Sequence, residues 1–160
     1  MNILVLCTGN SARSILLEYI LGTDPRIKSF SAGSKPTGSV NPASLRLLSN
    51  IGVQIDGYSS KSWDTFSTEN VPHMDIVITV CGNARDETCP YWPGNPLRAH
   101  WGVDDPANAI GSEIEIDRAF LSAYNILNQR AQAFLSQPIE SMSTVNLQAL
   151  LNNVSTIGVK

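Results

Sequence analysis

The chain has 160 residues, of which 42% are hydrophobic and 16% charged, and its formal net charge is −3. This length and balance are typical of one globular domain with a sizeable core, and they exclude a disordered chain. The lack of clustered Lys and Arg argues against a nucleic-acid partner, although one local loop can bind an anion even in an acidic protein.

No signal peptide or transmembrane segment is recognisable, because the first hydrophobic run, Ile3 to Leu6, is short and has no basic leader. We therefore expect a cytoplasmic protein without a membrane partner. In the cytoplasm Cys7, Cys81 and Cys89 rest as thiols, so a disulfide among them would be catalytic or redox-sensing. Their odd number also argues against a structural disulfide framework.

The first part of the chain predicts a strand, a loop and a helix. Residues 2–7 form a short hydrophobic strand, and residues 8–14 are small and polar, which suits a tight loop. A hydrophobic helical stretch follows over 15–20, and we expect Gly22 to end it. A second strand is predicted over 27–31.

The next elements are a helix and a strongly hydrophobic strand. Asn41 is a helix N-cap with Pro42 at the first helical position, and this helix runs to about Asn50, before Gly52. Residues 74–80 predict a buried strand that ends at the second cysteine.

The last third begins with a loop rich in Asn, Asp, Pro and Gly over 82–96, followed by a short strand over 97–101. Ser112 caps a long helix over Glu113 to Leu135, whose hydrophobic residues recur at helical spacing. Beyond it, the sequence predicts a weakly polar tail with a short helix near 145–151.

Strands that alternate with helices predict an α/β fold in which helices flank a parallel sheet. We expect one such domain over residues 1–137 and a C-terminal tail of unassigned role over residues 138–160. Ligands of these folds bind beyond the carboxyl ends of the strands. Cys7 and Cys81 both stand at strand ends, and can therefore share that edge.

The segment from Cys7 to Ser14 carries the chemistry. It reads Cys, five residues, Arg, Ser between a strand and a helix. Small residues let successive N–H groups form an anion nest, and Arg13 grips two oxygens of a tetrahedral anion. In such a nest Cys7 should be a nucleophilic thiolate, with Ser14 donating a hydrogen bond to the sulfur. The expected oxyanion-binding residues are Thr8, Gly9, Asn10, Ser11, Ala12 and Arg13. The alternative is a buried cysteine beside a solvated arginine.

Several segments together carry a family resemblance that spans about residues 2–135. They are Cys-Thr-Gly-Asn-Ser-Ala-Arg-Ser at 7–14, Ser-Ala-Gly at 31–33, Val-Asn-Pro at 40–42, Val-Cys-Gly-Asn-Ala-Arg-Asp-Glu-Thr-Cys-Pro at 80–90 and His-Trp-Gly-Val-Asp-Asp-Pro-Ala at 100–107. The chain resembles the low-molecular-weight tyrosine phosphatase superfamily and, within it, the thioredoxin-linked arsenate reductases. The resemblance implies a phosphatase-like fold with an N-terminal anion-binding loop.

The resemblance also implies a general acid in Asp105, which protonates the leaving oxygen when the thiolate attacks. Asp104 is the neighbouring alternative, and only the family position favours Asp105. The Asp-Asp-Pro segment also reads simply as a turn.

In the related reductases three cysteines act in turn, which implies a Cys7–Cys81 disulfide followed by a Cys81–Cys89 disulfide. Taken alone, Cys81 would be a small buried hydrophobic residue and Cys89 a chance loop thiol. A zinc site from Cys81, Cys89, His73 and His100 is a further alternative, but the cysteine spacing is wider than in the usual zinc pair. We expect no metal and no cofactor.

The sequence departs from the family pattern at a few positions. Ala12 replaces a cysteine of many relatives, Ile15 stands where tyrosine phosphatases carry proline, and Ala107 where they place tyrosines. The last two departures disfavour the phosphatase reading.

Some reductases hold a potassium ion near the loop. The comparable residues here are Asn10, Glu18, Ser31 and Ser59, but Lys61 falls where an acidic ligand would help. Its cation can replace the ion, so bound potassium is not predicted.

The sequence leaves three candidate functions. The first is arsenate reduction for arsenic detoxification, with thioredoxin as reductant and phosphate or sulfate as mimics of arsenate. The second is a phosphatase that uses Cys7, Arg13 and Asp105. The third is a non-enzymatic oxyanion or redox sensor.

Overall fold

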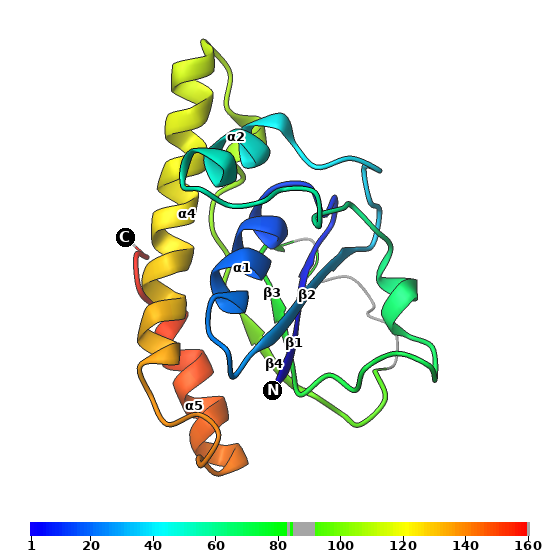
Figure 1. Ribbon diagram of the computed structural model, residues 1–160. Coiled ribbons are helices and arrows are strands. Elements are labelled where there is room, and N and C mark those ends of the chain that lie inside the picture. Colours follow the sequence, from blue (N-terminus) through cyan, green and yellow to red (C-terminus); the bar gives the residue numbers. More distant parts are fainter. Residues whose placement is uncertain (83, 85–91, 160) are drawn as a thin grey trace.

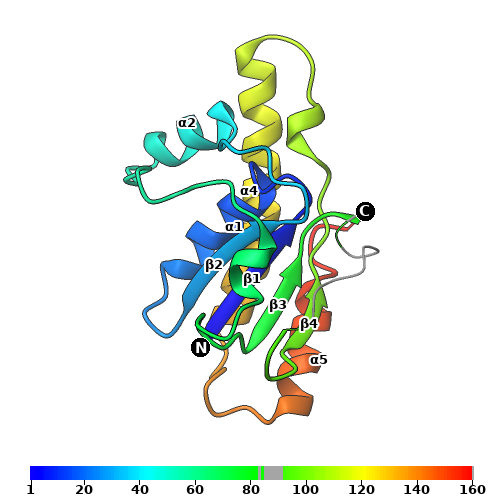
Figure 2. The ribbon, with the colours of Figure 1, turned by 90° about the vertical axis from the view of Figure 1, so that its right-hand side faces the viewer.

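A computed structural model describes residues 1–82, 84 and 92–159 of the chain. Its centre is a parallel sheet of β1 (Asn2–Cys7), β2 (Lys28–Gly33), β3 (Ile76–Thr79) and β4 (Leu97–His100) in the order β2-β1-β3-β4. Figure 2 shows the four strands side by side. The predicted parallel α/β fold is confirmed, and the four predicted strands are present with bounds that differ by at most two residues.

The helices are α1 (Arg13–Gly22), α2 (Pro42–Asn50), α4 (Glu113–Leu135) and α5 (Thr144–Val154), with short 3₁₀ turns η1 (Trp63–Phe66) and η2 (Pro106–Asn108). Figure 1 shows α1, α4 and α5 on one side of the sheet and η1 on the other. The expected N-caps are confirmed, since the Asn41 side chain accepts from the Ala43 N–H and Ser112 forms a reciprocal capping box with Glu115.

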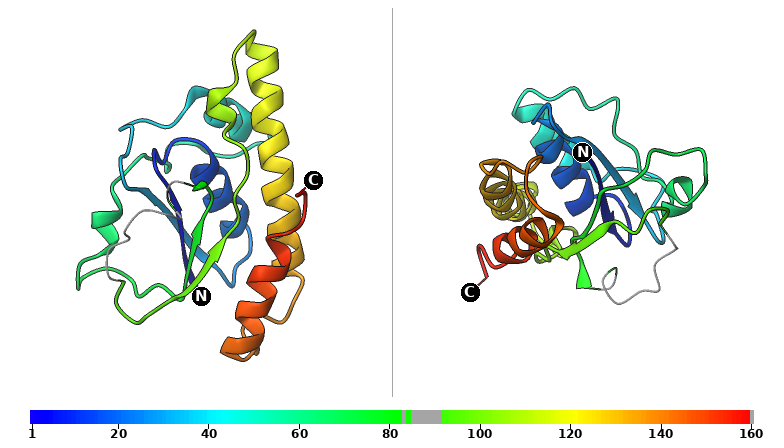
Figure 3. Two further views of the ribbon diagram at one scale, coloured as in Figure 1. Left: turned by 180° about the vertical axis from the view of Figure 1, so that it is seen from behind. Right: turned by 90° about the horizontal axis from the view of Figure 1, so that it is seen from below.

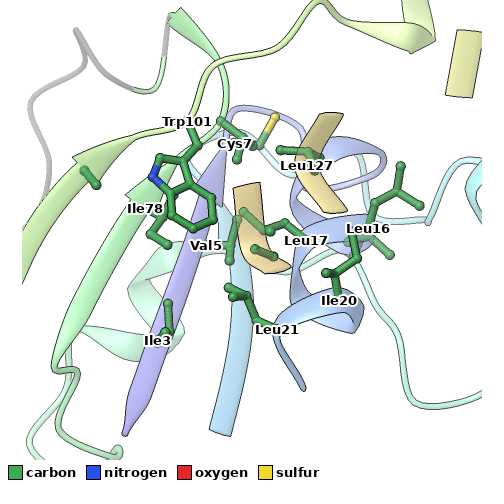
Figure 4. Close-up of a cluster of buried hydrophobic side chains, with 14 of the residues drawn as sticks. Ile3, Val5, Cys7, Leu16, Leu17, Ile20, Leu21, Ile78, Trp101 and Leu127 are labelled. Carbon is green, nitrogen blue, oxygen red and sulfur yellow. The ribbon is translucent and has the colours of Figure 1, made fainter. Parts of the chain in front are cut away.

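Alternate residues of β1 face two separate hydrophobic clusters, as a strand buried on both faces requires. On the helical face Ile3 and Val5 pack with residues of α1 and α4, and Cys7 stands at the end of the same row (Figure 4). On the other face Leu4 and Leu6 pack with Phe66 and Trp92 among others. The strand is therefore buried from Ile3 to Cys7, which fixes the position of the cysteine.

Gly22 corrects one expectation. It is the last residue of α1 rather than the residue that follows the helix, and Thr23 is the C-cap with right-handed backbone angles. A Cβ at Gly22 would lie 2.7 Å from the Ser29 hydroxyl of β2, so the glycine permits close packing of α1 on the sheet.

The segment after Pro138 is well packed. Leu147, Leu151 and Val154 of α5 are buried in the helical-face core, and α5 lies against β4 and α4 (Figure 3). Of the helices in the described part of the chain, none is long and apolar enough to cross a membrane.

Candidate active site

The loop between β1 and α1 is held by hydrogen bonds to its carbonyl groups. The Gly9 carbonyl accepts from the Thr37 N–H at 3.0 Å and from the Ser60 hydroxyl at 3.0 Å. The Ser11 carbonyl accepts from the Asn41 N–H at 2.9 Å and from the Ser44 hydroxyl at 3.1 Å. With these carbonyls bound on the outer side, the N–H groups are left for the interior of the loop.

Asn10 stabilises the loop from inside through its side chain. Its side chain is fully buried, and its Nδ2 donates to the hydroxyls of Ser14 and Ser31, both at 2.9 Å. Its Oδ1 accepts from the Lys61 N–H at 2.9 Å. Its φ of 46° is in the left-handed region, which asparagine tolerates better than most residues and which reverses the chain here.

The open N–H groups of the loop make an anion nest. The N–H groups of residues 10–13 have no acceptor within the described part of the chain. Ala12, the N-cap of α1, has no side-chain bond that would satisfy the helix end. An anion beside Cys7 would therefore meet both free donors and the positive end of α1.

Arg13, the first residue of α1, points its guanidinium at the segment after β4. Its Nη2 donates to Asp105 Oδ2 at 2.7 Å, and its Nη1 donates to the Val103 carbonyl at 3.0 Å. Its Nε is buried without a partner among the described residues. The Nε–H group is thus left over for an additional acceptor.

Asp105 lies at the N-cap of η2, where its Oδ1 accepts from the Ala107 N–H at 3.1 Å. Asp104, the alternative acid, is exposed and is not an ion-pair partner of Arg13. The geometry therefore brings Asp105 rather than its neighbour to the loop, and the Asp-Asp-Pro segment is also the turn that the sequence predicts.

Cys81 follows β3 and lies beside the loop on the neighbouring strand. Its sulfur is buried and unbonded to another cysteine among the described residues, as is that of Cys7. The Ala84 N–H donates to the Cys81 sulfur at 3.4 Å, and the Thr8 hydroxyl lies 3.5 Å from it. The predicted meeting of two cysteines at the carboxyl ends of β1 and β3 is present.

The two thiols determine each other's ionisation. The interaction with Cys7, aided by the Thr8 hydroxyl and the Ala84 N–H, lowers the pKa of Cys81 to about 5. The interaction with Cys81 and burial raise the pKa of Cys7, against the opposing effects of Arg13 and the Gly9 N–H. The two sulfurs lie so close that the pKa of one rises as that of the other falls, and the Cys7 thiolate stays a prediction.

Ser14 is placed differently from its expected role. It is fully buried, and its hydroxyl accepts from Asn10, with no hydrogen bond to Cys7 among the described residues. Its observed part is to hold Asn10, and through it the curve of the loop.

Cys89, expected as the third thiol, lies outside the described residues. The zinc alternative shares this residue, and the described residues contain no group of three His, Cys, Asp or Glu side chains that could hold a metal.

The residues compared with a potassium site form a connected network. Ser31 Oγ donates to Glu18 Oε2 at 2.5 Å, and burial raises the pKa of Glu18 while Ser31 and the Lys61 cation oppose that rise. Lys61 Nζ donates to the Ser59 carbonyl at 3.0 Å. The cation of Lys61 thus acts on this network, as the sequence suggests.

The sequence alone does not identify the residues that anchor the loop from outside. Ser44 and Ser60 belong to no recognisable motif, and the Val103 carbonyl is a backbone group whose bond to Arg13 the motif at 100–107 does not reveal. Gly33 belongs to the Ser-Ala-Gly segment that the sequence analysis singled out. The structure explains the glycine sterically, because a Cβ there would lie 2.4 Å from the Thr8 carbonyl oxygen.

Known proteins resemble this chain over most of its length. Residues 2–145 match the family model for "Low molecular weight phosphotyrosine protein phosphatase". A protein of Halalkalibacterium halodurans named "Arsenate reductase" is 38% identical over 133 residues, which are 81% of this chain and 91% of that protein.

Two solved structures extend the comparison. An arsenate reductase from Archaeoglobus fulgidus superposes with a TM-score of 0.60 at 22% identity, over 81% of this chain and 98% of its own, which speaks for the fold alone. A thioredoxin-dependent arsenate reductase of Corynebacterium glutamicum gives a TM-score of 0.53 at 26% identity, over 85% of this chain and 63% of its own.

Proposed function

The chain belongs to the low molecular weight phosphotyrosine protein phosphatase family, and on that premise we propose that it is an arsenate reductase. The observation that carries this proposal is Cys81, a second thiol beside the nucleophile Cys7 at the edge of the anion loop. Hydrolysis of a phosphate ester has no use for it, whereas reduction of arsenate needs two electrons from protein thiols.

The first step is attack on arsenic. The oxyanion enters the nest of residues 8–13 and takes the guanidinium of Arg13 from Asp105. Cys7 passes its proton to the Cys81 thiolate beside it and bonds to arsenic. One arsenate hydroxyl leaves as water after it accepts a proton from Asp105, which takes up that proton from solvent once its carboxylate has lost Arg13.

The second step is reduction. Cys81 loses its proton to solvent, with the Thr8 hydroxyl and the Ala84 N–H beside its sulfur to stabilise the thiolate, and attacks the Cys7 sulfur. The sulfur–arsenic bond breaks with its electron pair on arsenic, so arsenite leaves and a Cys7–Cys81 disulfide remains.

The third step moves the oxidation outward. Cys89 attacks Cys81 and releases the Cys7 thiolate, and a thioredoxin dithiol then reduces the Cys81–Cys89 disulfide. This step is proposed from the position of Cys89 in the sequence and from the thioredoxin-dependent relative.

A turnover assay with arsenate, thioredoxin, its reductase and NADPH tests the proposal, run beside aryl phosphate hydrolysis. Cys81→Ser and Cys89→Ser should lose arsenate turnover and keep ester hydrolysis, which uses Cys7, Arg13 and Asp105. Non-reducing peptide mapping should show Cys89→Ser stalled as a Cys7–Cys81 disulfide after one equivalent of arsenate.

Other outcomes separate the remaining functions. Ester hydrolysis without arsenate turnover in the wild type would favour the phosphatase. Oxyanion binding with neither activity would favour a sensor. Wild-type rates of arsenate turnover in Cys89→Ser would replace the three-cysteine relay with a route through two cysteines or an external thiol.

A further inference from the structure

Arg130, in the second half of α4, is a charged residue inside the protein. It is 1% exposed, and burial lowers the pKa of its guanidinium. No carboxylate pairs with it in the described part of the chain, so its charge is met by dipoles alone. Burial of a cation without a counter-ion costs desolvation free energy. Its presence here therefore suggests that the hydrogen bonds of Arg130 have a function.

Those hydrogen bonds join two distant segments. Arg130 Nη1 donates to the Gly102 carbonyl at 3.0 Å, in the segment that leads to Asp105, and Nε donates to the Ile157 carbonyl at 2.9 Å, after α5. Figure 3 shows the chain after α5 running back along α4 to its end. The planar guanidinium thus links the C-terminal segment to the residues that lead to Asp105.

The segment from Trp101 to Asp105 is held at successive residues. The Trp101 N–H donates to the Thr79 carbonyl at 2.8 Å, and its indole N–H donates to the Leu151 carbonyl of α5 at 3.0 Å. The Val103 N–H donates to the Val80 carbonyl at 3.3 Å. Only Arg130 holds Gly102 among the described residues, two positions before Asp104.

We propose that Arg130 is a positioning residue for Asp105, which couples the segment after α5 to the placement of the general acid. This rests on the proposed role of Asp105. The proposal also assigns a function to the residues beyond 145, where the match to the family ends.

The test compares variants that act on the two ends of this link. Arg130→Gln removes the guanidinium. Gly158→Val leaves Arg130 intact but displaces the Ile157 carbonyl, because Gly158 has a φ of +75° and a Cβ there would lie 3.0 Å from Ile126. Arg118→Gln is the matched control, an exposed arginine of the same helix. Asp105→Asn is the reference for loss of the acid.

The readout is the dependence of kcat/KM on the leaving group across a series of aryl phosphates. A misplaced acid harms poor leaving groups most, so kcat/KM for phenyl phosphate should fall roughly 10- to 100-fold in both variants. With a good leaving group such as 2,4-dinitrophenol, the loss should stay below about threefold. Arg118→Gln should match the wild type. Arg130→Lys should be intermediate, because one ammonium replaces the planar fork.

A second readout needs no turnover. Hydrogen exchange of peptides covering 101–108 should accelerate in Arg130→Gln and Gly158→Val, while β1 keeps its protection. Unchanged exchange would overturn the proposal. Faster exchange with the wild-type leaving-group dependence would also overturn it, since Arg130 would then be merely structural. If the wild type hydrolyses no ester and reduces no arsenate, the proposed function fails, and exchange alone decides whether Arg130 holds the segment.

Discussion

The anion loop and the acid segment meet in one site, but they are built in different ways. The loop of residues 7–14 follows a strand that is buried from Ile3 onwards, and Asn10 stabilises the loop from inside. The acid segment of residues 101–108 is held by long side chains from elsewhere, Arg13 of α1 and Arg130 of α4.

This difference separates binding from proton transfer. The loop has fixed N–H donors before any ligand arrives, which favours a preorganised anion site. Asp105, the proposed acid, is paired with Arg13, which in the proposed function also binds the oxyanion. Entry of the anion therefore has to rearrange the acid end and not the loop, and substitutions at the two regions should have separable effects.

The largest effect is expected at the nucleophile. Cys7→Ser should lower both arsenate reduction and ester hydrolysis by on the order of 10⁴-fold or more, because a serine hydroxyl is far less acidic and less nucleophilic than a thiol. Phosphate binding, measured by calorimetry, should persist because the nest is intact. Substantial turnover in this variant would remove Cys7 as the nucleophile.

Arg13→Lys breaks the link between the two regions. We expect kcat/KM to fall roughly 100- to 1,000-fold, since an ammonium cannot copy the bidentate grip. Thermal stabilisation by phosphate or sulfate should also shrink. Arg46→Lys is the control, because Arg46 pairs with Asp117 at the surface. Equal stabilisation of Arg13→Lys and wild type by the anions would show that Arg13 is not the clamp.

Leu151→Ala loosens the support of the acid segment while leaving the loop untouched. Leu151 is fully buried in α5, so the free energy of unfolding should fall by about 2–5 kcal/mol in urea denaturation. Val145→Ala, at a position 78% exposed on the same helix, should stay within about 0.5 kcal/mol. Equal stability of the two variants would mean that α5 adds nothing to the core.

The smallest effect concerns the charge shared by the thiols. Thiolate absorbance at 240 nm should titrate with a midpoint of about 5 for Cys81, and Thr8→Val should raise that midpoint because a donor is lost. A midpoint unchanged by Thr8→Val would show that the hydroxyl does not stabilise the thiolate.

The same shift makes stability depend on pH. The lowered pKa of Cys81 stabilises the folded protein fully above its ordinary value of 9.0, and this stabilisation is lost as pH falls towards about 5. The raised pKa of Cys7 acts in the opposite sense, so stability should fall as pH rises above 9.0. Urea denaturation across this range, with Cys81→Ser as control, would show the difference.

The sequence by itself determined the elements whose signals are local. The hydrophobic run of β1, the Asn41 cap of α2 and the capped periodicity of α4 predicted those elements, since burial and end-capping depend on neighbouring residues. The Cys-x5-Arg spacing likewise predicted the anion loop, because a strand, a tight loop and a helix follow in order. The prediction that Gly22 ends the first helix from outside was wrong, because the glycine lies within the helix and permits its close packing against Ser29.

Only the tertiary structure decided how the site is charged and supported. The sequence placed Cys7 and Cys81 at one edge, but the pKa of each thiol depends on the other thiol, and further on Thr8 and Ala84 for Cys81 and on Arg13 for Cys7. No local pattern marks Arg130, since its partners are backbone carbonyls 28 and 27 residues away. Backbone groups carry no residue signature, and contacts across such distances arise only when the chain has folded.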